Sequence, residues 1–145
     1  MFSHILLPTD GSPLSQLAID RGLTLAKENG AKVTVLNVIP VYHISALQSE
    51  ALAYGAEQFE EENQQDARAC LDRVAASAND HGVPCDTLCV NDDHPYEAII
   101  RVATELQCDL ITMASHGRKG VAGMLLGSQT HKVLTHSTIP VLVYR

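Results

Sequence analysis

Short apolar runs alternate along this chain with longer segments in which apolar residues recur every three or four positions. The runs occupy residues 5–7, 32–39, 86–90, 109–114 and 140–144, and most are bounded by proline, glycine or polar turn residues. Such runs predict strands. The segments between them predict helices that end near residue 29, run from about 49 to 80, follow Pro95, and cover about 128–136. Residues 41–47 show neither period and are expected to be irregular.

This alternation predicts how the elements assemble. Apolar strands that alternate with crossover helices favour a parallel sheet with helices on both faces. The predicted fold class is therefore a doubly wound α/β domain with five parallel strands in the order 3-2-1-4-5. No linker, internal repeat or low-complexity tract interrupts the pattern, so we expect a single domain over residues 1–145.

Composition narrows the classes of function. Hydrophobic residues make up 46% and charged residues 19% of the 145 positions, as in ordinary globular domains. The net charge of -7 argues against nucleic acid as a partner. No apolar run is long enough to span a membrane, and the N-terminus lacks the basic start of a signal peptide, so no membrane association is expected. The four cysteines form no C-x-x-C pair, which favours a reducing, cytoplasmic setting.

Several residues suggest chemistry that their spacing does not favour. His131 and His136 are five positions apart, off the shared face that helical metal ligands use, and no metal site is predicted. Ser115 and His116 are adjacent, but neighbours on an extended chain point apart and no G-x-S-x-G elbow surrounds the serine, so hydrolase chemistry is not favoured. Asp10 fits either a partner for a metal-bridged phosphate or an N-cap of the following helix, and both interpretations stay open.

A glycine-spaced loop follows the fourth predicted strand and leads into a helix. The N–H groups at a helix N-terminus attract anions, and nearby hydroxyls and cations add to this. Because ligands of such sheets bind beyond the carboxyl ends of the strands, residues 8–10, 38–40 and this loop are expected to meet around a phosphate-bearing ligand. The same composition also fits a flexible loop before an ordinary capped helix, and the residues alone leave both open. Neither G-x-x-x-x-G-K-[ST] nor G-x-G-x-x-G is present. The residues concerned are Gly117, Arg118, Lys119, Gly120, Gly123, Gly127, Ser128 and Thr130.

Taken together, these segments resemble universal stress proteins. The similarity covers the full length and is carried by residues 5–12, the second predicted strand at 36–39 and, most specifically, the C-terminal third from Cys108 to Val143. ATP-binding members of that family carry G-x2-G-x9-G-[ST]. The matching positions here are Ala114, Gly117, Gly127 and Ser128, so an alanine replaces the first glycine. The resemblance implies a Rossmann-like fold of the adenine-nucleotide α-hydrolase type.

The resemblance also implies a ligand and a partner. The ligand would be ATP, or AMP or ADP, bound with Mg²⁺. The Val38 backbone would meet the adenine, Pro8, Thr9 and Asp10 would line the nucleoside, and the glycine loop would hold ribose and phosphates. The partner would be a second copy of the chain, paired through the last strand at 141–144. The predicted binding residues are Pro8, Thr9, Asp10, Val38, Ala114, Ser115, His116, Gly117, Arg118, Gly127, Ser128, Gln129 and Thr130.

Two functional hypotheses follow. The first is a cytoplasmic stress-response regulator in which bound nucleotide acts as a switch. At most it would hydrolyse ATP slowly, because no base can be named. The second is a nucleotide-free dimeric interaction module, with Ala114 marking the loss of the site. A branched side chain at Gly127 is expected to crowd the phosphate path and abolish nucleotide binding while leaving the fold intact.

Overall fold

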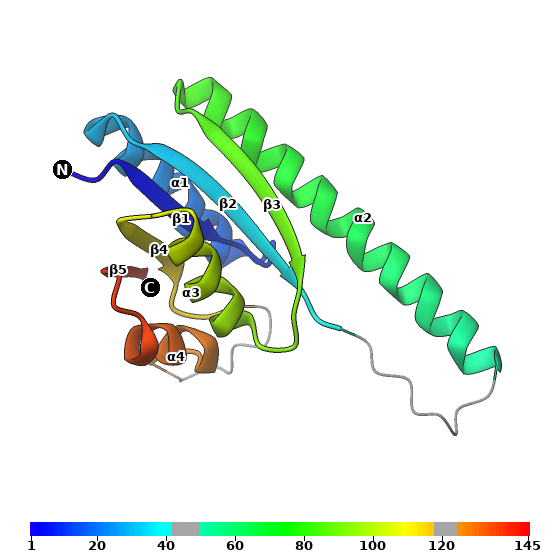
Figure 1. Cartoon of the computed structure of the whole chain (residues 1–145). Coiled ribbons are helices and arrows are strands. Elements are labelled where there is room, and N and C mark those ends of the chain that lie inside the picture. The colour runs from blue at the N-terminus through cyan, green and yellow to red at the C-terminus, as the bar shows by residue number, and fades with distance from the viewer. Residues whose placement is uncertain (42–49, 118–124) are drawn as a thin grey trace.

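A five-stranded parallel sheet in the order β3-β2-β1-β4-β5 forms the centre of the computed structural model (Figure 1). The structure describes residues 1–41, 50–117 and 125–145. The predicted fold class and strand order are confirmed, while the expected irregular segment 41–47 lies almost wholly outside the described residues. The elements are β1 His4–Pro8, α1 Pro13–Asn29, β2 Lys32–Ile39, α2 Glu50–His81, β3 Cys85–Asn91, α3 Pro95–Glu105, β4 Leu110–Ala114, α4 Ser128–His136 and β5 Val141–Tyr144.

Strand alternation divides the core between the two faces of the sheet. On β1, Ile5 and Leu7 pack with α1 and α2, whereas Leu6 packs with α3 and α4. On β2, Val35 belongs to the first cluster and Leu36 to the second. All five side chains are fully buried, which explains why these strands appear in the sequence as continuous apolar runs.

Local chemistry sets the ends of α1. Ser12 is the N-cap, and its side chain accepts a hydrogen bond from the Ser15 N–H at 3.2 Å. Asp10 does not cap the helix, because its Oδ1 instead accepts from the Ser12 N–H at 2.9 Å and so shapes the turn that precedes the cap. The capping interpretation of Asp10 is therefore wrong. Gly30 ends the helix in the left-handed conformation, with φ +65°.

The long helix α2 packs on the sheet only along its C-terminal part. Leu71, Val74 and Ala78 join the core, whereas the N-terminal end extends away from the sheet (Figure 1). Phe59, near this N-terminal end, is 48% exposed for this reason. In the described residues no helix is both long and apolar enough to cross a membrane.

Candidate functional site

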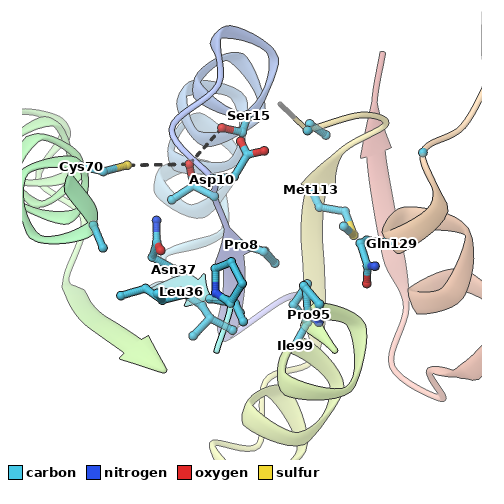
Figure 2. A pocket seen from close by; sticks show the side chains of 18 of the residues that line it. Pro8, Asp10, Ser15, Leu36, Asn37, Cys70, Pro95, Ile99, Met113 and Gln129 are labelled. Carbon is cyan, nitrogen blue, oxygen red and sulfur yellow. Dashed lines mark hydrogen bonds between the residues drawn. The ribbon is translucent and has the colours of Figure 1, made fainter. Parts of the chain in front are cut away.

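A cavity of about 650 Å³ opens at the carboxyl edge of the sheet. It lies where the chain, having run outward from β1 to β2 and β3, crosses back to β4, so it occupies the topological switch point of the sheet. Figure 2 shows side chains converging on it from β1, β2, α2, β4, α3 and α4. Among the predicted residues its lining contains Pro8, Thr9, Asp10, Val38, Ala114, His116, Gly117, Gly127, Ser128, Gln129 and Thr130.

The N-terminus of α4 forms one end of this cavity. Gly127 is its N-cap and supplies no capping side chain. Within the described part of the chain, the N–H groups of Ser128, Gln129 and Thr130 have no acceptor. Three unpaired N–H groups and the positive end of the helix dipole make this end of the cavity attractive to an anion.

Side chains of the first turn of α4 hold the helix against its neighbours. The Thr130 hydroxyl, which is buried, donates to the Ala114 carbonyl at 2.8 Å. The Gln129 Oε1 accepts from the Tyr96 N–H at 3.0 Å, at the start of α3. Both side chains therefore help to position the helix terminus, and the backbone N–H groups of the first turn remain for a ligand.

Gly127 is required for a close approach between two backbone segments. Its N–H donates to the Ser115 carbonyl at 2.6 Å, and a Cβ at this position would lie 2.9 Å from the same oxygen. Its φ of -69° is ordinary, so space and not backbone conformation calls for glycine. Ser115 does not line the cavity, but its backbone ties the end of β4 to the start of α4.

Gly117 brings the loop after β4 against the end of β1. A Cβ at Gly117 would collide with the Asp10 carboxylate, so these two residues, 107 positions apart, are immediate neighbours. Thr9 braces the same turn, because its Oγ1 shares a hydrogen bond with Ser15 Oγ at 3.0 Å and accepts from the Gly11 N–H at 3.1 Å. Arg118, also predicted to bind, lies outside the described residues.

Ala114, which replaces the first glycine of the motif, is an unstrained strand residue. It is the last residue of β4 and is buried. In the described segments, Gln107 is the one non-glycine residue with a positive φ. An alanine at position 114 therefore carries no strain from a left-handed backbone, and its methyl group adds only volume to the wall of the cavity.

Ser115 and His116 contact each other, contrary to the expectation from an extended chain. Their Oγ and Nδ1 atoms share a hydrogen bond at 3.0 Å. The expectation was wrong because β4 ends at Ala114, so the strict alternation of a strand no longer holds at the next two positions. Among the described residues, His116 Nε2 is buried without a hydrogen-bond partner.

Comparison with known proteins identifies the family that has this architecture. The sequence profile of the universal stress protein family matches residues 1–145. The chain belongs to the universal stress protein family. A universal stress protein of Bacillus subtilis is 32% identical over 149 aligned residues that cover all of both chains.

Solved structures agree at the level of the fold. That of a universal stress protein from Methanocaldococcus jannaschii has a TM-score of 0.82 at 26% identity, covering 99% of this chain and 95% of the other. A universal stress protein crystallised in complex with cAMP has a TM-score of 0.74 at 25% identity, covering 99% and 97%.

One wall of the cavity in this universal stress protein was not predicted. It consists of one face of α2 together with the β2 residue Asn37. Ala67 and Cys70 lie at apolar helical spacing, so the sequence indicates that they share a buried face. Asn63 and Asp66 are polar, and no motif marks them as part of a cavity wall. The residues of this wall are Asn37, Phe59, Asn63, Asp66, Ala67 and Cys70.

Proposed function

We propose that this universal stress protein binds an adenine nucleotide, ATP in particular, in the cavity at the switch point. The observation that carries the proposal is the anion-attracting N-terminus of α4, which opens into a cavity of about 650 Å³. That volume lies within the usual range for small-molecule sites. The related structure in complex with cAMP supports an adenine nucleotide as the ligand class.

The described residues suit the parts of such a ligand. The N–H groups of Ser128, Gln129 and Thr130 would receive phosphate oxygens, as helix N-termini commonly do. Val38 and Pro8 would line the nucleoside side. Asp10 is a carboxylate on the cavity wall, and Mg²⁺ is commonly bound by one or two carboxylates together with the phosphates of its nucleotide. Mg²⁺ would then enter with the nucleotide and supply charge neutralisation.

The regulatory part of the proposal is a cytoplasmic, nucleotide-dependent switch in the response to stress. Phosphates at the N-terminus of α4 would act on a helix whose start two hydrogen bonds tie to the end of β4, from Thr130 to Ala114 and from the N-cap Gly127 to Ser115, which follows the strand. Nucleotide binding at α4 would therefore shift the conformation of the sheet edge that β4 and β5 form.

We further propose a homodimer formed through β5, an edge strand of the sheet. The carbonyls of Pro140 and Tyr144 accept from the N–H groups of Ile111 on β4 and of Ser115 just after it, so alternate residues direct their backbone groups toward β4. Val141 and Val143 accordingly direct their N–H and carbonyl groups outward. An apolar edge strand with unpaired backbone groups is a template for pairing with a second copy.

Isothermal titration calorimetry with ATP and Mg²⁺, and with AMP and GTP for comparison, tests the binding proposal. In Ser128→Pro the helix should persist, because proline is well tolerated at the first helical position, but one phosphate donor is lost and ATP binding should weaken. Asp10→Ala should weaken binding less than a substitution in the phosphate cradle. Leu134→Ser, on the exposed far end of α4, is the matched control and should bind like the wild type.

The outcomes separate the two hypotheses. Saturable ATP binding that Ser128→Pro weakens and Leu134→Ser retains supports the nucleotide site. No heat up to millimolar ATP, with an unshifted melting temperature, would overturn it and favour the nucleotide-free dimeric module.

A further inference from the structure

The edge of the sheet that β3 forms carries unpaired backbone groups. The Val33 N–H donates to the Pro84 carbonyl at 2.8 Å, and the Asp92 N–H donates to the Ile39 carbonyl at 3.0 Å. Because the ladder between these two bonds stays in register, the even-numbered residues of β3 direct their backbone groups toward β2. The odd-numbered residues therefore direct theirs outward, where no described residue pairs with them. They are Cys85, Thr87, Cys89 and Asn91.

This edge lacks the features that usually prevent strand pairing. Natural edge strands are protected by shortness, bulges, proline or lysine. The strand β3 has seven residues, pairs with β2 without a bulge, and contains no lysine or proline. Thr87 and Cys89 are exposed, so the middle of the edge is accessible. The edge is therefore open to the addition of another strand.

The two faces of the sheet differ in chemistry beside this edge. Leu88 and Val90 are half-buried and pack against the core cluster that contains Ile99 of α3. The odd-numbered side chains lie on the other face, where Cys85 packs against the cluster that contains Leu71 of α2. Apolar side chains of an added strand would cover the exposed parts of Leu88 and Val90, and its polar side chains would lie on the α2 face.

Charge identifies which end of the added strand should be basic. The helix α2 contains eight acidic residues and two arginines, so it accounts for -6 of the net charge of -7. Figure 1 shows that α2 runs beside β3 and continues past its carboxyl end. Residues 57–66, in the N-terminal part of α2, include five acidic and no basic residues. A segment that extends past the carboxyl end of β3 therefore meets a negative field, which attracts lysine and arginine.

We propose that the β3 edge binds an extended segment of a partner protein by strand addition, antiparallel to β3, with basic residues just before the paired part. Antiparallel pairing is slightly more stable per residue, and it places the start of the segment at the carboxyl end of β3. A second copy of this chain does not supply this charge, because residues 80–84, which precede its own β3, include an aspartate and no lysine or arginine. The proposal does not depend on nucleotide binding.

Fluorescence anisotropy of labelled peptides tests the proposal on the full chain. The probe is a run of lysines followed by Thr-Val repeats, so that the valines can lie beside Leu88 and Val90. The threonines then lie opposite Thr87 and Cys89 and exchange backbone hydrogen bonds with them. Methylation of the threonine backbone nitrogens should lower affinity by roughly tenfold or more, whereas methylation of the valine nitrogens, which point away from β3, should leave it nearly unchanged.

Variants test the same pairing from the side of the protein. Thr87→Pro removes an outward N–H without touching the bonds to β2 and should lower affinity by roughly tenfold, whereas Thr87→Val keeps that N–H and should bind like the wild type. Glu60→Gln/Glu61→Gln should weaken binding severalfold and reduce its dependence on salt. Glu28→Gln/Glu105→Gln, at exposed positions of α1 and α3, has the same net charge and should bind like the wild type. Melting temperatures establish that each variant is folded.

Each result supports or overturns the proposal. Equal affinity of the two methylated peptides, or of Thr87→Pro and Thr87→Val, overturns strand addition at β3. Equal affinity for a peptide in which the lysines follow the repeats overturns the charge and the direction assigned to the segment. In light scattering of the protein alone, a lower mass for Thr87→Pro than for the wild type would show that a second copy occupies the edge, which also overturns the proposal. ATP titration of the wild type tests the proposed function separately from all of these outcomes.

Discussion

A side chain at Gly127 should destabilise the fold itself, in addition to any effect on nucleotide binding. In Gly127→Ala the new Cβ would lie 2.9 Å from the Ser115 carbonyl oxygen and 3.4 Å from His116 Cα. The oxygen must retreat by about 0.5 Å to reach ordinary contact at 3.4 Å, yet it also accepts the Gly127 N–H at 2.6 Å. Overpacking of this kind costs about 1–3 kcal/mol, and a weakened hydrogen bond adds about 0.5–1.5 kcal/mol.

The lower entropy of the unfolded chain offsets part of this cost, by about 0.4–1 kcal/mol for glycine to alanine. The net loss in the free energy of unfolding is therefore about 1–3 kcal/mol, or roughly 3–9 °C in melting temperature at this chain length. The sequence led to the expectation of a blocked phosphate path in an intact fold. That expectation leaves out the loss of stability, because it assumes that the side chain would point to the ligand.

Scanning calorimetry without ligand measures the effect, and Gly55→Ala is the matched control. Gly55 lies within α2, and no atom lies within 4 Å of a Cβ built there. That substitution should stabilise by roughly 0.5–1 kcal/mol, because alanine is the better helix former. Equal melting temperatures for Gly127→Ala and the wild type, or a rise like that of Gly55→Ala, would refute the argument from the Ser115 carbonyl.

Two further predictions follow from a buried histidine and from the edge of the sheet. Burial, with a smaller contribution from Lys32, lowers the pKa of His4 below 6.5. As the pH drops, the His4 side chain of the unfolded chain is therefore protonated first, and the free energy of unfolding should fall as the pH drops through about 6.5. The urea midpoint of His4→Gln should depend less on pH near 6.5 than that of the wild type. An identical pH dependence would contradict the role given to His4. Val143→Pro removes an outward N–H of β5 without touching the bonds to β4, so light scattering should find a monomer where the wild type is a dimer; a dimeric variant would place the interface elsewhere.

The fold was predictable because its signals are local and periodic. The β-branched residues at 32–39 predict a strand, and the structure has the same bounds for β2. The errors fall where periodicity stops being informative. Leu106 continues the apolar spacing of α3, but it is the C-cap and is 40% exposed, because the helix ends one residue earlier. The spacing of apolar residues along a helix does not indicate where that helix loses contact with the sheet.

The site was predictable only where a motif marked it. Gly117, Gly127 and Ser128 carry the spacing of a known pattern, and the structure brings them to one cavity. Asn37 has no such mark, because inside an apolar strand a single asparagine has the same appearance whether it pairs within the core or faces a ligand. The two cases differ only in the surroundings of the side chain in the folded chain, where Asn37 lines the cavity.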